Sequence, residues 1–368
     1  MAGVTMRVLD RRTLNRAALE RQLLLKRSDM SVRGAIERLV AMQAQENNVP
    51  YYGLWTRLTG FRKQQLTDLM TDRSAVRGTM LRGTQHLALA DDYLWLRPLV
   101  HHCLLRARQA GFGRVTKDWD LDELATEARK LLDGRVLTRP QLARELAELW
   151  PDRDLMALGW SAQALLSVVH PPPSGTWNVM GATPFALAEE WIGRPLHEVG
   201  PARLIRRYLA AFGPASVKDF QMWSGLRRTD SAFTELRPEL RVHRDENGVE
   251  LFDLPDARLP DDGPAPVRFL PGFDNLVLAY ADRTRLMTDE HRRIVCVGSE
   301  IKPTLLVDGR VHGLWTLKHD RKADTATLSV ELFAPLPDEP AVEEEATRLL
   351  TFATPEATHK LHITAWTS

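Results

Sequence analysis

Cysteine is scarce in this chain of 368 residues, and its scarcity excludes two kinds of protein. Cys103 and Cys296 are the only cysteines, too few for a disulfide framework or for a zinc site built on thiolates. A chain with so little cysteine suits a reducing compartment, and we expect a cytoplasmic protein.

Long apolar runs are missing as well. No stretch approaches the roughly 18–20 apolar residues of a membrane-spanning helix, and residues 1–7 lack the apolar core of a signal peptide. The chain also has no GxxxxGKS/T motif and no strand-linked GxGxxG, the two sequence patterns of phosphate-binding loops. We therefore expect no membrane contact, no cofactor and no metal ion.

Charge is nearly balanced over the whole chain, at +1, but it is unevenly distributed. Residues 1–110 carry 18 Lys and Arg against 9 Asp and Glu, a net +9, and the remaining residues carry 31 against 39, a net −8. A basic third on a neutral protein indicates a localised anionic partner, such as a phosphate backbone. An arginine-rich solvated surface is the alternative interpretation.

Helix and turn signals recur along residues 1–258 in the order of a winged helix, three helices followed by a hairpin. Thr13, Ser31 and Thr138 are predicted helix caps, and the tight turn before Val217 separates two helices as in a helix-turn-helix. The sequence thus predicts three winged-helix-like units, at residues 1–133, 134–198 and 199–258. Their expected helices cover residues 13–27, 31–42, 64–70, 91–108, 137–146, 161–169, 186–192, 202–212, 217–224 and 231–236, with hairpins or wings at 75–89, 170–177 and 241–252.

The composition changes after residue 254. Residues 256–266 are rich in Pro and Asp and have the character of a linker, and β-rich runs separated by turns follow. These runs predict a C-terminal antiparallel sheet or β-barrel at residues 259–368, which makes the fold class α+β. The expected strands cover residues 267–270, 276–280, 294–297, 304–307, 325–333 and 360–366, and a closing helix covers 343–352, with a solvated Glu343–Glu345 run at its start.

One short run, Gln43-Ala44-Gln45, has the character of a reactive site. Residues i and i+2 do not face each other on a helix, but they share a face when the chain is extended, and the preceding helix is expected to end near Met42. Two carboxamides on one face can hold a water molecule between them, since each donates and accepts hydrogen bonds. The alternative is that both side chains cap a helix end and satisfy loop amides.

Five residues near this run are candidates for contacts with a nucleic acid. Thr84 and His86 share a face of a predicted strand, and Arg82 precedes them. Arg82 would contact a phosphate or is a surface arginine, and His86 would contact a phosphate, orient the motif or be structural. Asn48 lies in the loop after the motif, and Trp55 would either stack on a base or belong to the core.

Stretches spread over nearly the whole chain together resemble the AlkZ-like family of winged-helix DNA glycosylases. The catalytic motif of that family is Gln-x-Gln with an aliphatic middle residue, while a sister branch has Gln-x-Asp. Gln43-Ala44-Gln45 matches the first form with a small middle residue, so the resemblance implies that Gln43 and Gln45 are catalytic. The other similar stretches are at residues 49–58, 82–87, 208–217, 270–276, 281–285 and 307–316.

The resemblance further implies three tandem winged helices in a C-shaped arrangement around a DNA channel, with a C-terminal β-barrel. Members of the family remove alkylated bases, especially N7-alkylguanines, and some unhook interstrand crosslinks made by antibiotics. We therefore expect double-stranded DNA with alkylated or crosslinked purines as the partner, a location at the nucleoid, and a monomer.

Two neutral glutamines suffice for such chemistry because N7-alkylation makes the purine cationic and weakens its glycosidic bond. The base departs largely unaided, so a positioned water matters more than a strong base, and both carboxamides are expected to accept hydrogen bonds from that water. Glu46 is an alternative base. The lysines nearest the motif in sequence are Lys26 and Lys63, and none adjoins it, which predicts a monofunctional hydrolase.

Two other functions stay open on the sequence. Winged helices regulate more often than they catalyse, which favours a DNA-binding module or transcriptional regulator without catalysis. Against it, no helix carries an obvious set of base-reading Arg, Asn and Gln side chains, and Gln-Ala-Gln lies outside the helix-turn-helix of the third unit. A glycosylase-like scaffold that sequesters a small toxin is the third hypothesis.

Overall fold

Capping residues set the ends of the helices in the N-terminal third. In a computed structural model, which describes residues 7–367, α1 begins after Asp10, whose carboxylate accepts a hydrogen bond from Thr13 N at 2.7 Å. Thr13 is therefore not the cap that its sequence suggests. Ser31 caps α2 as predicted, but α2 ends at Leu39 and not at Met42. The elements are β1 (Val8–Leu9), α1 (Arg11–Arg21), α2 (Val32–Leu39), β2 (Met42–Gln43), α3 (Val49–Trp55) and α4 (Lys63–Thr71).

The expected absence of a signal peptide concerns residues 1–6, which lie outside the described residues.

A six-stranded sheet joins the first two predicted units. The predicted hairpin is present as β3 (Ala75–Thr79) and β4 (Gln85–Leu89), and the sheet order is β2-β4-β3-β6-β7-β5. Gly78 on β3 pairs with Val169 on β6, and a side chain at position 78 would meet the Tyr93 ring at 2.7 Å. The missing side chain therefore lets the two halves of the sheet meet. The added strands are β5 (Leu137–Thr138), β6 (Val168–Val169) and β7 (Pro184–Leu187).

Six helices flank this sheet. The helix expected at residues 91–108 is two helices, because Pro98 cannot donate a backbone hydrogen bond and α5 ends just after it. A helix that the sequence analysis missed, α7, packs its buried Leu124 and Leu132 against the core of α8 and α9. The helices are α5 (Ala90–Leu99), α6 (His101–Phe112), α7 (Leu121–Leu132), α8 (Arg139–Leu149), α9 (Leu155–Leu165) and α10 (Ala188–Ile192).

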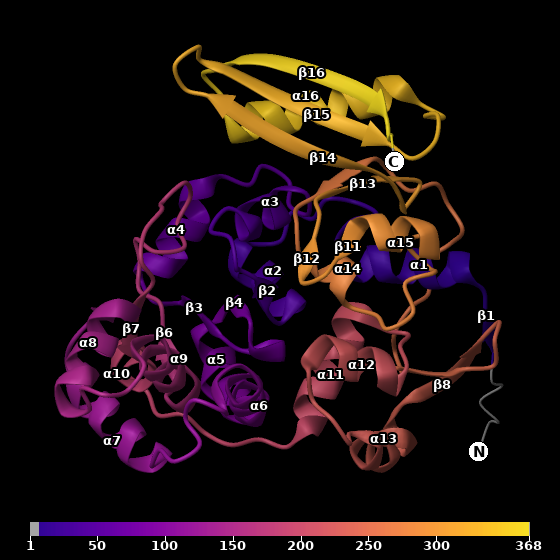
Figure 1. Cartoon of the computed structure of the whole chain (residues 1–368). Coiled ribbons are helices and arrows are strands. Elements are labelled where there is room, and N and C mark those ends of the chain that lie inside the picture. Colours follow the sequence, from indigo (N-terminus) through magenta and orange to yellow (C-terminus); the bar gives the residue numbers. More distant parts are fainter. Residues whose placement is uncertain (1–6, 368) are drawn as a thin grey trace.

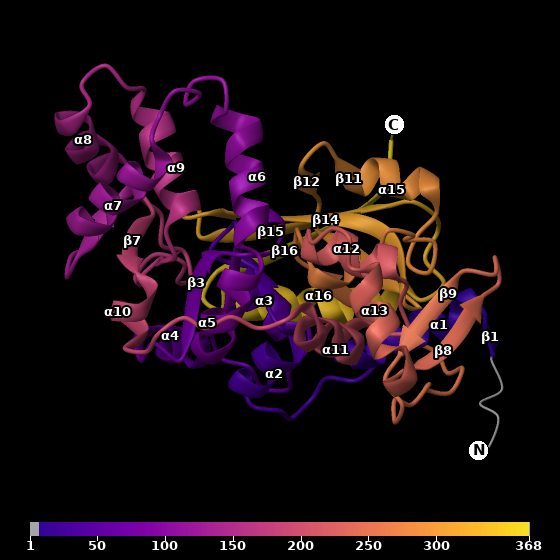
Figure 2. The same cartoon turned by 90° about the horizontal axis from the view of Figure 1, so that it is seen from below.

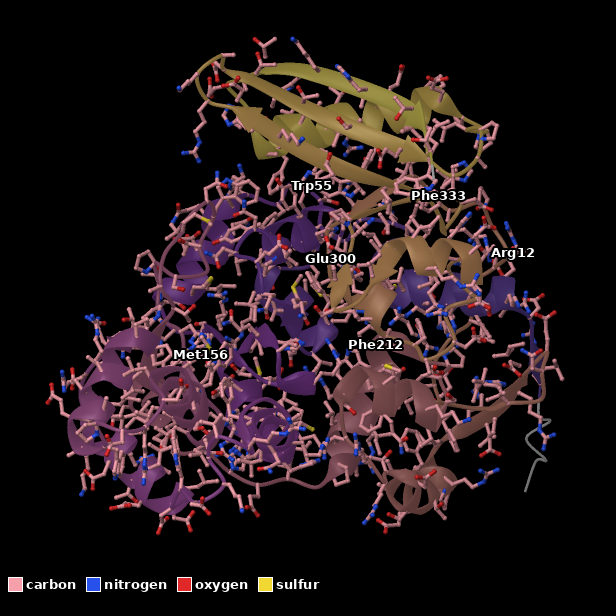
Figure 3. All side chains as sticks on the ribbon, in the orientation of Figure 1. Arg12, Trp55, Met156, Phe212, Glu300 and Phe333 are labelled. Carbon is pink, nitrogen blue, oxygen red and sulfur yellow. The ribbon has the colours of Figure 1, made fainter. Side chains whose placement is uncertain are left out.

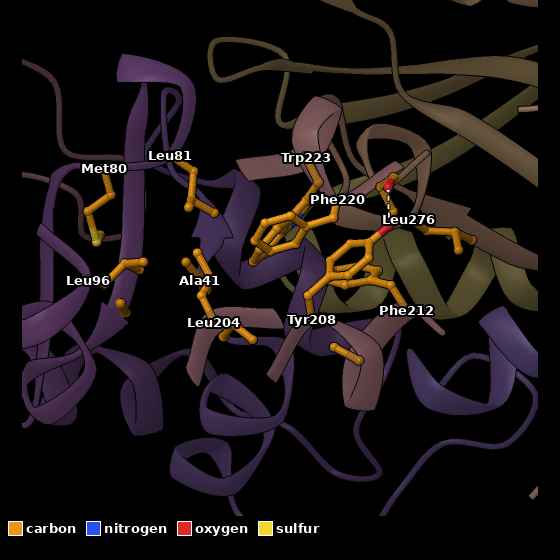
Figure 4. Packing of buried hydrophobic residues seen from close by; sticks show 14 of the residues in the cluster. Ala41, Met80, Leu81, Leu96, Leu204, Tyr208, Phe212, Phe220, Trp223 and Leu276 are labelled. Atoms are coloured by element: carbon orange, nitrogen blue, oxygen red, sulfur yellow. Dashed lines mark hydrogen bonds between the residues drawn. The ribbon is translucent and has the colours of Figure 1, made fainter. Parts of the chain in front are cut away.

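An aromatic cluster forms the centre of the third unit (Figure 4). Tyr208 and Trp223 have ring centroids 5.0 Å apart, and Phe212 and Phe220 complete the cluster. The Tyr208 hydroxyl donates to Ala279 O at 2.8 Å, which ties this unit to the C-terminal part of the chain. The elements are α11 (Pro201–Phe212), α12 (Val217–Ser224), α13 (Asp230–Leu236), β8 (Arg241–Asp245) and β9 (Glu250–Asp253), and β1 joins the hairpin β8-β9 as a parallel third strand.

The C-terminal sheet is open and mixed, which corrects the prediction of an antiparallel sheet or β-barrel. Its order is β10-β13-β14-β15-β16, so β10 and β16 are its edges, and β16 pairs parallel to β15. The parallel pairing follows from α16 (Glu339–Ala353), which lies between these strands in sequence, because parallel neighbours need a crossover connection. The strands are β10 (Arg268–Leu270), β13 (Thr304–Val307), β14 (Arg310–Asp320), β15 (Thr325–Leu332) and β16 (Thr358–Ala365).

Two expected strands are partly helical instead. Residues 276–278 of the strand expected at 276–280 fall in α14 (Asn275–Leu278), because the Asp274 carboxylate accepts from Leu276 N at 2.9 Å and starts a helix. Residues 294–297 end α15 (Asp289–Val295) and enter the hairpin of β11 (Cys296–Val297) and β12 (Glu300–Ile301). The interpretation of Glu343–Glu345 as solvated is wrong for Glu345, which is buried and paired with Arg27.

The C-terminal sheet lies over the N-terminal helices, while α7–α10 and α11–α13 lie on opposite sides of α5 and α6 (Figures 1 and 2). Apolar side chains of α2 and α3 share one core with α16 and with β13 and β15. A buried ion pair adds to this contact, since Arg57 and Asp274 meet through two hydrogen bonds of 2.8 Å. Within residues 7–367, no helix is both long and apolar enough to cross a membrane.

Candidate active site

The Gln43-Ala44-Gln45 motif begins on β2 and bends at Gln45, so only its first residue is on the strand. Gln43 pairs with His86 in the antiparallel register of β2 and β4, and Ala44 N donates to Gln85 O at 2.8 Å. Both glutamines contact the segment of residues 82–85, since Gln43 Oε1 accepts from Arg82 and Thr84 and Gln45 Oε1 faces Gln85 N. Gln43 is 4% exposed, whereas Gln45 is exposed to solvent.

The chain enters the motif through a strained residue. Val40 follows α2 with φ 67° and ψ −60°, a conformation that a β-branched residue rarely adopts. The next carbonyl, Ala41 O, accepts a hydrogen bond from Asn275 Nδ2 at 2.7 Å. A side chain of the C-terminal part of the fold thereby holds the sharp exit from α2 that leads into β2.

The buried glutamine has its oxygen occupied. Gln43 Oε1 accepts hydrogen bonds from Arg82 Nη2 at 3.0 Å and from Thr84 Oγ1 at 3.3 Å. A guanidinium only donates, so the amide oxygen and not the nitrogen must face Arg82. Within residues 7–367, Gln43 Nε2 makes no protein hydrogen bond, and its two N–H donors are the part of the carboxamide that is available.

The exposed glutamine, Gln45, can still accept a hydrogen bond. Gln45 Oε1 faces Gln85 N at 3.5 Å, a long contact that leaves most of the acceptor capacity of the oxygen unused. Gln43 is thus fixed as a donor, and Gln45 can accept. A water molecule between them can take one hydrogen bond from Gln43 and give one to Gln45.

Arg82 is hydrogen-bonded to the motif and is partly buried. Its backbone has φ 55°, and its guanidinium donates to Trp223 O as well as to Gln43. Burial, with a contribution from Arg283, lowers the pKa of Arg82 to about 10, so the side chain is still charged at neutral pH. These contacts favour a role in holding Gln43 over the phosphate contact that the sequence also left open.

His86 is also enclosed, at 1% exposed. Burial, reinforced by Arg82, lowers the pKa of His86 to about 3, so its ring is neutral. Nδ1 lies 2.9 Å from Thr84 O, to which it donates, and Nε2 faces Arg82 Nη2 at 3.5 Å. Of the three roles that the sequence left open, these contacts favour the orientation of the motif over a contact with phosphate.

Arg77 is a site residue that the sequence analysis missed. It donates from Nε to Ala44 O at 2.9 Å and from Nη2 to Gln45 O at 3.4 Å, so it holds the backbone of the motif. Burial lowers the pKa of Arg77 to about 10. Its third contact, to Ser174 Oγ at 3.1 Å, connects the motif to the loop between β6 and β7. An arginine on a short strand carries no sequence signal for this role.

The last two candidates have separate environments. Asn48 forms two hydrogen bonds of 2.8 Å with Asn178, one to its side chain and one to its backbone N–H. Trp55 is 8% exposed, lies beneath the C-terminal sheet, and stacks on Phe352 with centroids 5.7 Å apart (Figure 3). Asn48 is at the surface beside the motif, whereas Trp55 belongs to the core, the alternative that the sequence left open.

Two buried histidine rings predict that the fold weakens in acid. Burial lowers the pKa of His86 and that of His170 from 6.5 to about 3, with Arg82 and Arg77 respectively adding to the effect. The folded protein keeps these rings neutral while the unfolded chain protonates them below pH 6.5, so protons favour unfolding. The contribution of these rings to the free energy of unfolding is therefore fully present above pH 6.5. It decreases towards pH 3, and near pH ~4 the loss is about 3 kcal/mol per ring.

Urea denaturation at about pH 7 and about pH 4.5 measures this loss. His170→Asn should reduce the difference in the free energy of unfolding between the two pH values by the contribution of one ring. His362→Gln, a change of an exposed residue on β16, should leave the difference as in the wild type. Equal stability of the wild type at both pH values would contradict the prediction.

Comparison with known proteins identifies the family. The model of the AlkZ-like DNA glycosylase family matches residues 36–352, which include the motif. The chain is 27% identical over 323 residues to the interstrand DNA cross-link repair glycosylase of Streptomyces sahachiroi, covering 81% of this chain and 85% of that protein. The structure of the Streptomyces sahachiroi DNA glycosylase AlkZ is similar with a TM-score of 0.77 at 22% identity, over 97% of this chain and 100% of that chain. The chain therefore belongs to the AlkZ-like family and is a DNA glycosylase.

Proposed function

We propose that the enzyme hydrolyses the N-glycosidic bond of N7-alkylated purines in duplex DNA, with Gln43 and Gln45 positioning the water. The single observation that supports this proposal is that, in the described part of the chain, Gln43 is left with free hydrogen-bond donors, whereas Gln45 is left with a free acceptor. Arg82 and Thr84 occupy the oxygen of Gln43, while the oxygen of Gln45 is largely free.

The reaction does not need a strong base from the protein. The alkylated purine is a cation that leaves as a neutral base, and positive charge develops on the deoxyribose. A water that accepts from Gln43 and donates to Gln45 keeps a lone pair for C1′, and as its oxygen bonds to C1′ the excess proton passes to bulk water, because an amide oxygen is too weak a base to keep it. The Gln45 oxygen places partial negative charge beside the sugar cation. This arrangement revises our expectation that both glutamines accept from the water.

A monofunctional reaction fits the environment of Lys63. Its ammonium lies 4.1 Å from the ring centroid of Trp177 and donates to Ala353 O at 3.0 Å. Burial lowers the pKa of Lys63 to about 8, but the cation is held among aromatic rings and is not presented to a substrate. We therefore infer that Lys63, the nearest lysine after the motif in sequence, does not form a Schiff base with the abasic sugar.

The predicted winged-helix units at residues 1–133, 134–198 and 199–258 would form the walls of the DNA channel, with the basic first unit as the main phosphate contact. Within these units Asn48 is the retained surface candidate for a DNA contact. The relative from Streptomyces sahachiroi is named for repair of interstrand cross-links. We extend this substrate to the present enzyme and propose that it unhooks bulky N7 adducts, including crosslinks.

Excision from defined duplexes tests the proposal. One duplex carries a single N7-methylguanine and another carries a crosslink between two guanine N7 atoms, and abasic sites are read as alkali-labile breaks. We expect product from both duplexes at a rate far above spontaneous depurination, and no borohydride-trapped complex. Failure on both, with duplex binding retained, would overturn the proposed substrate class. Release from the crosslink alone would narrow it to bulky adducts.

A further inference from the structure

The loop between β6 and β7, residues 170–183, carries an apolar side chain that the fold does not use. Met180 is 90% exposed, the largest value among the exposed large hydrophobic residues in the described part of the chain. Residues 170–183 contain no Asp, Glu, Lys or Arg, so the loop is not built to bind phosphates. The sequence analysis took its first half, residues 170–177, for a wing.

Hydrogen bonds fasten this loop to the catalytic motif. Asn47, two residues after Gln45, donates from its side chain to Val179 O, the carbonyl next to Met180. Asn48 forms the two hydrogen bonds to Asn178 that are described above. The two residues before Met180 are therefore tied to the two residues that follow Gln45 and Glu46 in the chain.

The base of the loop is rigid, while its tip is open. Trp177 packs edge-on against Tyr52 and Phe352, with centroids 5.1 and 5.6 Å away, and Arg77 donates to Ser174. Beyond Trp177 the backbone turns outward at Asn178, with φ 58°, and a side chain added at Gly181 would touch nothing within 4 Å. The loop thus presents Met180 in a fixed place without burying it.

We propose that Met180 is a wedge that enters the base stack beside the damaged nucleotide and holds that nucleotide open at the Gln43–Gln45 site. Proteins that open or kink duplex DNA insert apolar side chains of this kind between base steps. Burial of the thioether between bases recovers the apolar contact that the free protein lacks. The proposal deepens the proposed function, because the wedge acts on the same site and on the same duplex substrate.

Met180→Ala separates the wedge from the chemistry. Because the side chain is exposed, we expect unchanged unfolding and a single-turnover excision from a paired duplex that is slower by about 10- to 100-fold. Excision should recover when the N7-methylguanine lies in an unpaired bubble, where no stack has to be opened. Met156→Ala is the matched control, since Met156 is 65% exposed on α9, in the unit of α7–α10 (Figure 3), and should behave as the wild type.

A binding measurement tests the wedge even if the substrate proposal fails. A duplex with 2-aminopurine next to a tetrahydrofuran abasic analogue cannot react, and its fluorescence rises when the neighbouring stack opens. We expect the wild type and Met156→Ala to raise the fluorescence, Met180→Leu to keep most of the rise, and Met180→Ala to lose it. Equal fluorescence with wild type and Met180→Ala would overturn the wedge. So would an equal loss of excision on paired and bubble substrates.

Discussion

Gln45→Ala is expected to slow excision of N7-methylguanine by about 100-fold or more, with little change in duplex affinity or in the free energy of unfolding. Among residues 7–367, the one hydrogen bond of this exposed side chain is the long contact to Gln85 N, so its removal costs the fold little. The loss of rate arises because the water no longer has an acceptor that fixes its orientation. Single-turnover excision and a fluorescence-anisotropy titration with the same duplex separate rate from affinity.

Glutamate substitutions test the assigned polarities more sharply than alanine does. Gln43→Glu keeps the size of the side chain and an oxygen for Arg82, but it removes the N–H donors, so excision should decrease by about 100-fold. Gln45→Glu keeps an acceptor, and excision should stay near the wild-type rate or exceed it. The reverse order of the two variants would show that Gln43 accepts from the water. Equal loss of DNA binding and of excision in Gln45→Ala would instead show a contact role.

The position of the motif was partly predictable from local sequence. Gln43 follows a helix that Ser31 starts and lies on a strand, and His86 lies on the predicted strand β4, but Gln45 and Thr84 fall just outside these strands, so strand geometry does not by itself place them. Pairing of β2 with β4 then brings Gln43 and His86 together. The proposal that Gln43 and Gln45 are the catalytic residues comes from the resemblance, because spacing by itself does not distinguish them from the other side chains of the site.

The polarity of the carboxamides was not predictable, because it depends on contacts between distant segments. Arg82 can face Gln43 only because its backbone adopts φ 55° in the turn between β3 and β4. Arg77 reaches the motif from β3, and nothing in a single arginine on a strand indicates which carbonyls it will meet. The parallel pairing of β16 with β15 was not predictable for the same reason. It depends on where α16 packs, and the local β pattern carries no signal for that.

Asp274→Ala is expected to destabilise the protein by about 3–5 kcal/mol, the usual cost of leaving a buried charge without its partner. The Arg57 side chain is fully buried and that of Asp274 is 3% exposed. Besides Asp274, Arg57 contacts Gly53 O at 3.0 Å and Gln22 Oε1 at 3.3 Å, neither of which carries charge. The variant also loses the cap of α14, so the whole segment that holds Ala41 is weakened.

An exposed ion pair provides the control. Arg33 and Asp91 meet at 2.9 Å with side chains that are 46% and 49% exposed, and Asp91 also pairs with Arg194, so Arg33→Ala should cost no more than about 1 kcal/mol. Guanidinium denaturation followed by tryptophan fluorescence gives both values, and Arg57→Met combined with Asp274→Leu should recover much of the loss. A loss of less than about 1 kcal/mol for Asp274→Ala would show that water reaches Arg57 and screens its charge.

The double variant has a second use, because Asn275 still holds Ala41 in it. Excision by a stably folded double variant would show that the motif depends on this contact of the C-terminal part and not on the buried charge itself.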